Sequence, residues 1–365
     1  MKRMKAVVRD RLKRLRVELR RRGLAAMLVT SPVDVGYLSG FTGEDSWLIV
    51  TGGGATLVTD SRFTEQAEVD CAGISIVVRK RAMIEAVGGL LRRKHIRKVG
   101  FDPGNVTVAV RSKLARAAKK VRLTEVPEVV ASLRARKDES ELRAIRRAVE
   151  VAEEAWASLR RAVRPGMSER RLAAELDHQM RLAGAEGPAF GTICGIDASG
   201  AMPHARPGDR RLRRGSVVVV DFGARVGGYV CDLTRVLFAG RIPPLARKVY
   251  ETVLEAQLAG IAAMRPGALL KDVDAAVRGV IDAAGWGKHF QHGTGHGIGR
   301  EVHERPGLSP LAGEGRLEQG MVVTVEPGVY LRGRFGIRIE DDVLVTRSGH
   351  RVLTSVEKDL EAMVL

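Results

Sequence analysis

Long apolar runs are missing from this 365-residue sequence. It has no stretch of about 18 apolar residues that would cross a bilayer. Its basic start is not followed by the apolar segment of an ordinary secretory signal, so we expect a cytoplasmic protein. Aromatic residues make up only 4% of the chain, which leaves the core to Val, Leu, Ala and Ile. The three cysteines, Cys71, Cys194 and Cys231, show no metal-type spacing, and such sparse use fits a reducing compartment.

Acidic residues are fewer than basic ones, and the difference lies mainly in the first third of the chain. The formal net charge is +18, and residues 1–130 hold 26 Lys and Arg against 13 Asp and Glu, which accounts for +13. A basic surface can attract the phosphates of nucleic acid. However, the sequence has neither zinc-finger spacing nor the paired aromatics of an RNA-binding sheet. We therefore expect nucleic acid to bind only non-specifically, if at all.

The chain divides into two predicted domains. Residues 1–132 begin with an amphipathic helix over 3–22 and then alternate short apolar runs with helical stretches, which predicts an α/β domain with a mixed sheet. This part has no Gly-rich phosphate loop and no cluster of His, Asp and Glu, so we assign it no chemistry. A charged segment opens the second domain, residues 133–365, in which long helices alternate with apolar strands.

The second domain contains an internal repeat. Arg164-Pro-Gly166 recurs as Arg265-Pro-Gly267, and Ala183-Gly184 recurs as Ala284-Gly285, each at an offset of 101 residues (265 − 164 = 101). An identical offset at separate places predicts two related halves, each with a helix pair that leads into strands. A site between such halves would draw residues from both.

Two aspartates at strand ends are the first chemical signal. Four valines lead into Asp221, and a short apolar run after the turn signal Gly227-Gly228 leads to Asp232. Two buried carboxylates side by side repel each other, so a cation between them would be required. Two ordinary aspartates exposed to water remain the alternative on this evidence alone.

Histidines gather in the segment Gln291–Glu304. Three of the eight histidines of the chain, His292, His296 and His303, fall within twelve residues and are separated by glycines. The glycines allow the backbone to run close to a ligand and disfavour a long helix. This clustering favours a ligand-binding role over that of ordinary core or surface histidines.

Two glutamates complete an oxygen-rich set. Glu326 ends an apolar strand, and Glu340 lies among alternating apolar residues. Arg338, two positions before Glu340, is the alternative structural partner of Glu340 if no metal binds. Two Asp, two Glu and one His suit a pair of divalent cations that share a bridging water. Such ions lie about 3.5–4 Å apart and lower the pKa of the shared water, so the pattern predicts metal-assisted amide hydrolysis.

The order of these residues resembles that of the pita-bread metallopeptidases. Asp-Phe-Gly and Cys-Asp-Leu-Thr-Arg surround the two aspartates, and His-Gly-Thr-Gly-His-Gly-Ile-Gly, Glu-Pro-Gly-Val-Tyr and Gly-Ile-Arg-Ile-Glu-Asp are similar to the proline-directed branch, prolidase and aminopeptidase P. Tyr37-Leu-Ser-Gly-Phe-Thr-Gly43 resembles the N-terminal domain of that branch. The resemblance implies a creatinase-like α/β N-terminal domain and an α+β pita-bread (creatinase/aminopeptidase) C-terminal domain with pseudo-twofold halves.

The resemblance also implies roles for individual residues. Two divalent metal ions would be held, with Mn²⁺ or Co²⁺ expected and Zn²⁺ or Fe²⁺ as alternatives. Glu326 would carry a proton from the bridging water to the leaving amine, and Tyr330 and Arg338 would bind substrate or support the site. The implied metal ligands are Asp221, Asp232, His296, Glu326 and Glu340, and the implied catalytic and substrate-binding histidines are His204, His292 and His303.

By the same resemblance, the expected activity is hydrolysis of the Xaa-Pro bond in small peptides by a metal-bridged hydroxide in a homodimer. The compact length favours a dipeptidase over aminopeptidase P. Methionine aminopeptidase has a similar metal set but normally lacks a domain like residues 1–130. A metal-free creatinase-like hydrolase, or a non-catalytic relative that binds nucleic acid or protein, would have lost ligands, whereas all five are present here.

Overall fold

Two compact units make up the computed structural model, which describes the backbone of residues 2–365 and the side chains from residue 6 onward. The first unit spans Met1–Arg134 and the second spans Ala135–Leu365. The charged segment that opens the second predicted domain begins inside helix α6 (Val129–Ala135). No helix in the described part of the chain is long and apolar enough to span a membrane.

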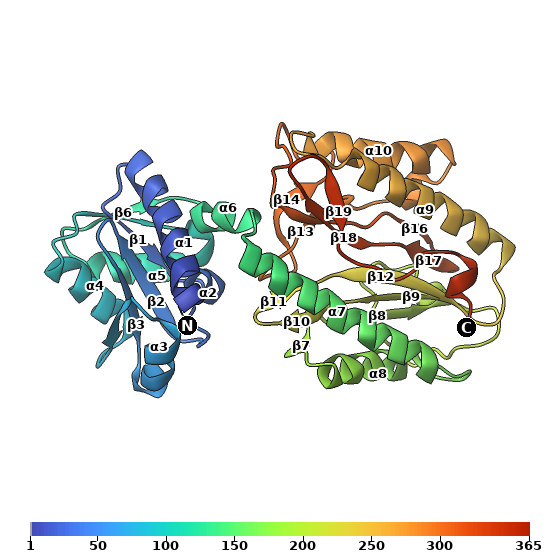
Figure 1. The fold of residues 1–365 in the computed structure, drawn as a ribbon, viewed down its shortest axis with the longest axis horizontal. Helices are drawn as coiled ribbons and strands as arrows, with labels where there is room; N and C mark the ends of the chain where they lie inside the picture. Colours follow the sequence, from blue (N-terminus) through green and yellow to red (C-terminus); the bar gives the residue numbers. More distant parts are fainter. Residues whose placement is uncertain (1) are drawn as a thin grey trace. The chain divides into compact units, whose positions relative to one another are not determined.

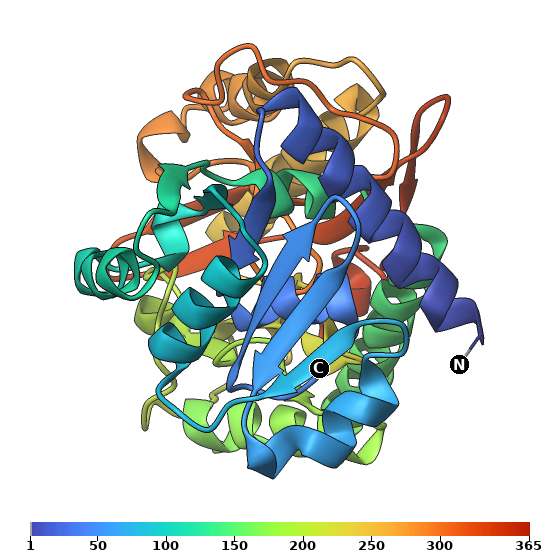
Figure 2. The ribbon, with the colours of Figure 1, turned by 90° about the vertical axis from the view of Figure 1, so that its left-hand side faces the viewer.

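A six-stranded sheet forms the middle of the first unit (Figure 1, Figure 2). Its strands are β1 (Ala26–Val29), β2 (Ser46–Thr51), β3 (Ala55–Thr59), β4 (Ser75–Val78), β5 (Lys98–Phe101) and β6 (Arg122–Glu125). The strand order is β4-β3-β2-β1-β5-β6. The pairs β1/β2 and β2/β3 are antiparallel, whereas β3/β4, β1/β5 and β5/β6 are parallel. The mixed α/β fold expected from the sequence is therefore confirmed.

Successive residues of a strand point to opposite sides of a sheet, so these apolar strands make both faces of the sheet apolar. Helices cover both faces. On one face, Met27 shares a core cluster with Leu15 of α1. On the other face, Leu28 shares a cluster with Leu91 of α4 and Leu114 of α5. The helices are α1 (Lys2–Arg21), α2 (Pro32–Ser39), α3 (Thr64–Asp70), α4 (Met83–Arg93) and α5 (Val108–Ala117).

Two helix pairs enclose the strands of the second unit (Figure 1). They are α7 (Glu139–Ala162) with α8 (Glu169–Leu182), and α9 (Pro244–Ala263) with α10 (Leu270–Ala283). The first pair packs against strands between the two pairs in sequence, and the second pair packs mainly against later strands. Ser168 caps α8, because its side chain accepts a hydrogen bond from the backbone N–H of Arg171.

The strands of the second unit form four small sheets, with orders β11-β10-β7, β12-β9-β8, β14-β13-β15-β18-β19 and β16-β17. Their bounds are β7 (Gly187–Pro188), β8 (Ile193–Ile196), β9 (Val217–Phe222), β10 (Ala224–Val226), β11 (Tyr229–Val230), β12 (Leu233–Phe238), β13 (Gly295–Gly297), β14 (Glu304–Leu308), β15 (Val322–Val325), β16 (Gly328–Leu331), β17 (Phe335–Arg338), β18 (Asp341–Val345) and β19 (His350–Val352).

The internal repeat predicted from the 101-residue offset appears as matching turns before α8 and α10. Gly166 and Gly267 have the same positive φ of 84°, a conformation that favours glycine. Arg211 donates to the carbonyl of Gly166 at 2.9 Å, and Arg316 donates to that of Gly267 at 2.8 Å. The two related halves predicted from the repeat are therefore present in this unit.

Candidate metal centre

The acidic residues of the predicted metal set lie at strand ends. Asp221 lies near the end of β9, and Asp232 directly precedes β12. These strands pair antiparallel with Asp221 opposite Thr234, so both aspartates come to the same end of the sheet. Glu326 directly follows β15, and Glu340 directly precedes β18.

The approach of β13 to β15 depends on a glycine next to His296. A Cβ atom on Gly295 would lie 1.9 Å from the carbonyl oxygen of Thr324, so a larger residue would force the strands apart. At this separation the backbone N–H of His296 donates to the hydroxyl of Thr324 at 3.0 Å. The hydroxyl of Thr324 in turn donates to Glu326 at 3.3 Å, so one threonine orients two members of the set.

The tautomer of His296 suits a metal ligand. Its Nδ1 lies 3.1 Å from the carbonyl oxygen of Gly297, so Nδ1 carries the proton and Nε2 keeps its lone pair. Burial, aided by nearby His303, lowers the pKa of His296 to about 4, so the ring is neutral near pH 7. Nε2 lies 3.3 Å from Oε1 of Glu326 and 3.8 Å from Oδ2 of Asp232.

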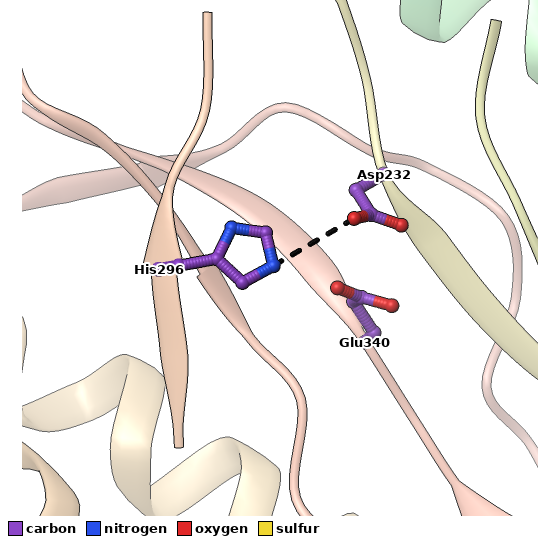
Figure 3. Close-up of side chains that lie close together, drawn as sticks. All are labelled: Asp232, His296 and Glu340. Atoms are coloured by element: carbon purple, nitrogen blue, oxygen red, sulfur yellow. Dashed lines mark ion pairs between the residues drawn. The ribbon is translucent and has the colours of Figure 1, made fainter. Parts of the chain in front are cut away.

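Three of these side chains point toward one another in Figure 3. Asp232, His296 and Glu340 each offer a ligand atom, and these atoms all lie within 4.8 Å of one another. Oδ1 of Asp232 and Oδ1 of Asp221 are buried and have no hydrogen-bond partner among the described residues. Because an unpaired buried carboxylate oxygen is costly, this donor set fits divalent cations.

Burial makes four carboxyl groups in this region hard to ionise. It raises the pKa of Asp232 and of Glu340 well above the usual range, and the neighbouring carboxylates add to the effect. Burial raises the pKa of Glu326 to about 7, against the opposing charge of Arg338. Burial likewise raises the pKa of Asp342, which accepts the backbone N–H of Asp232 at 3.1 Å, to about 8.

We expect protein stripped of metal to lose stability as the pH rises. Folded Glu326 and Asp342 keep their protons up to about pH 7 and 8, whereas unfolded carboxyl groups release theirs near pH ~4. The folded state binds more protons within this window, so the free energy of unfolding falls as the pH rises, by roughly a few kcal/mol. Urea unfolding of chelator-treated protein at about pH 5.5 and about pH 8 measures this fall. Added Mn²⁺ should remove most of it, and a urea midpoint that rises toward pH 8 in the stripped protein would contradict the expectation.

The metal set lines a cavity of about 900 Å³ in the second unit. His204, His292 and His303 also lie on its walls, so the structure brings the predicted histidines together with the predicted ligands. The ring of His303 meets that of His296 edge to face, with centroids 4.3 Å apart. Phe190 and Val302 supply apolar surface.

A chain of polar contacts connects Asp221 to His292. Arg338 pairs with Asp221 and donates to the hydroxyl of Tyr330 at 2.8 Å, and that hydroxyl lies 2.9 Å from Nε2 of His292. Tyr330 is not among the residues that line the cavity, whereas Arg338 is. Tyr330 therefore lies behind His292 and supports it.

The alternative in which Arg338 is the structural partner of Glu340 in place of a metal does not hold in the structure. Strand β17 ends at Arg338, so the strand alternation that would place both side chains on one face does not continue to Glu340. Arg338 pairs with Asp221 instead. Glu340 accepts a hydrogen bond from the hydroxyl of Thr234 at 2.6 Å.

Three residues at the site were missed by sequence reasoning. Arg206 lines the cavity, and its position two residues after His204 was the available signal. Asp342 and Thr324 orient Asp232 and His296 through contacts between segments far apart in the chain, which no local pattern indicates.

Comparisons with known proteins agree with this geometry. Residues 143–347 match Metallopeptidase family M24, and residues 11–136 match the Creatinase/Prolidase N-terminal domain. The chain is 32% identical over 355 residues to the Xaa-Pro dipeptidase of Pyrococcus horikoshii, which covers 97% of this chain and 99% of the relative.

Solved structures give the same result. The Xaa-Pro dipeptidase from Bacillus anthracis has a TM-score of 0.94 at 34% identity and covers 98% of this chain and 100% of its own. The X-Pro aminopeptidase from Thermotoga maritima has a TM-score of 0.88 at 34% identity and covers 94% and 98%. Because these matches extend over both units and the strand-end acids converge as the motifs imply, the chain belongs to metallopeptidase family M24, in the proline-directed branch of the pita-bread enzymes.

Proposed function

We propose that this metallopeptidase hydrolyses the Xaa-Pro bond of small peptides, with residues 133–365 as the catalytic domain and a dipeptidase activity favoured. The observation that carries the proposal is that one and the same cavity is lined by the strand-end acids, His296 and three further histidines. The relatives named Xaa-Pro dipeptidase support the dipeptidase activity. The similarity to an X-Pro aminopeptidase supports action on longer peptides as the second candidate.

Five residues are proposed to hold two divalent metal ions. When bound, the ions would polarise the scissile carbonyl and lower the pKa of a water shared between them. A mainly carboxylate set with one neutral imidazole suits Mn²⁺ or Co²⁺, the metals we propose, and does not exclude Zn²⁺ or Fe²⁺. The proposed ligands are Asp221, Asp232, His296, Glu326 and Glu340.

The protein's own groups are proposed to move the proton and hold the substrate. Glu326 lies beside His296 at the cavity and would pass a proton to the leaving amine. Both ring nitrogens of His292 are engaged, Nδ1 with the carbonyl of Gly293 at 2.8 Å and Nε2 with Tyr330 at 2.9 Å. His292 therefore offers its ring as a wall for the substrate.

The remaining histidines supply the polar contacts in this proposal. His204 and His303 line the cavity and are exposed enough to meet a bound peptide. They are proposed to hydrogen-bond the substrate and the oxyanion that forms at its carbonyl. The bond before proline is a tertiary amide without an N–H, so a site that holds the ring by packing suits it better than one that requires a backbone donor.

A small substrate panel tests the function. Metal-reconstituted protein is expected to cleave Leu-Pro at least about 100-fold more efficiently than Leu-Ala, because only the proline ring of Leu-Pro packs against the histidines that line the cavity. Chelation should abolish both activities, and Mn²⁺ or Co²⁺ should restore them. Faster cleavage of Arg-Pro-Pro than of Leu-Pro would establish the aminopeptidase alternative. Equal cleavage of Leu-Ala and Leu-Pro would reject the proline specificity, and full activity in metal-free protein would reject the metal centre.

We also propose a homodimer in a reducing, cytoplasmic compartment. The described cysteines are all free and buried, which supports the reducing compartment. The dimer rests on the family resemblance, and light scattering of the purified protein tests it.

A further inference from the structure

One arginine on the cavity wall has no partner among the described residues. Arg206 lines the cavity and is exposed, and no hydrogen bond or ion pair joins it to another residue of the described chain. The other lining arginine, Arg338, is buried and has four of its five N–H groups engaged. Arg206 is therefore the guanidinium at this cavity that is open to a ligand.

The backbone that carries Arg206 is held at both ends. The carbonyl of Pro203 accepts a hydrogen bond from Arg338 at 3.3 Å. The N–H of Gly208 donates to Oε2 of Glu169, a residue only 2% exposed, at 2.7 Å. These two contacts hold the backbone on either side of Arg206, so its Cα stays at the cavity wall.

The second anchor is absent from the other half of the repeat. Glu169 begins α8, and the residue at the same place in α10 is Leu270 (169 + 101 = 270). A leucine accepts no hydrogen bond, so the carboxylate clamp belongs to the half that carries Arg206. This difference between otherwise matching turns indicates that the segment from Pro203 to Gly208 has a function that the other half of the repeat does not share.

A substrate carboxylate needs such a cation. An Xaa-Pro dipeptide has an ammonium and a carboxylate roughly 7 Å apart along the chain. The metal end of the cavity offers a carboxylate no surplus positive charge, because two divalent ions and Arg338 (+4 + 1) would be balanced by four acidic side chains and the hydroxide shared by the ions (−4 − 1). A guanidinium binds a carboxylate through two parallel hydrogen bonds.

We propose that Arg206 binds the C-terminal carboxylate of the substrate and so selects Xaa-Pro dipeptides over peptides whose carboxylate is blocked. The proposal rests on the Xaa-Pro activity proposed above. It assigns this contact to Arg206 rather than to Arg338, because Arg338 is already engaged with other residues.

The test compares Leu-Pro with Leu-Pro amide, which differ only in the negative charge. In metal-loaded Arg206→Ala, kcat/KM for Leu-Pro should fall about tenfold, mainly through KM, while that for the amide stays within about twofold of wild type. Arg206→Lys should recover part of the loss, because it keeps the charge but not the paired donors. Arg213→Ala removes the same charge at an exposed site away from the cavity lining and should change neither substrate.

Product binding gives a readout that does not depend on turnover. Calorimetry of metal-loaded protein should show about tenfold weaker proline binding in Arg206→Ala, with prolinamide binding unchanged. Equal effects on the free and amidated ligands, or no effect on either, would overturn the role of Arg206. If wild type cleaves neither substrate, the proposed function fails, and the proline titration still decides whether Arg206 binds a carboxylate.

Discussion

Asp232→Asn is expected to lose at least about 10³-fold in kcat/KM for Leu-Pro and to release one or both metal ions. Asp232 lies at the centre of the site, with Oδ2 3.8 Å from Nε2 of His296 and Oδ1 buried without a partner among the described residues. An amide cannot supply the negative charge that a carboxylate ligand would bring to a divalent cation. Metal content by elemental analysis and steady-state kinetics measure the two effects together.

A matched control for this change is Asp209→Asn. Asp209 lies in the same unit, its side chain is 79% exposed, and its partner is Arg170 at 3.3 Å. Such an exposed pair contributes little to stability, so the control should keep its metal and its activity. Full metal content and near-normal activity in Asp232→Asn would remove that residue from the metal centre.

Glu326→Gln is expected to lower kcat by about 10²–10⁴-fold while KM changes little. The side chain lines the cavity and stands 3.3 Å from Nε2 of His296, where it can pass a proton to the leaving amine. Glutamine keeps an oxygen for a metal but cannot accept and return a proton.

The shape of the pH profile separates proton transfer from ligation. If Glu326 carries the proton, the remaining activity of Glu326→Gln should lose one ionisation from its kcat profile while the metal content stays close to wild type. Glu318→Gln, an exposed glutamate paired with Arg136, serves as control and should leave the profile unchanged. A full loss of metal with an unchanged profile would make Glu326 a ligand only.

Local sequence patterns accounted for most of the elements but not all. No apolar period marks helix α2, and Pro32 and Gly36 are residues more typical of a loop. In the structure Pro32 occupies the first turn, where its missing N–H costs nothing, and Ser31 caps the helix. Strand β6 carries no apolar alternation that would indicate it, because its residues Arg122–Glu125 are exposed or half-buried.

The sequence by itself determined which residues could form the site. Acids placed where apolar strands end, and glycines around His296, are local features with a local physical cause, so strand-end carboxylates were predicted from order alone. The 101-residue offset predicted two halves, and matching turns at Gly166 and Gly267 bear this out. The family resemblance is confirmed by the comparisons.

Only the tertiary structure decided which residue each of these charged groups pairs with. Arg338 could have served Glu340, a substrate or Asp221, and its pairing with Asp221 joins residues 117 positions apart. Such contacts follow from which strands become neighbours and from how much water each side chain loses, and no short-range pattern records either. For the same reason, no sequence pattern marks Arg206 as the arginine of the cavity that is free to bind a ligand. That role follows from the hydrogen bonds that Arg338 makes to other residues.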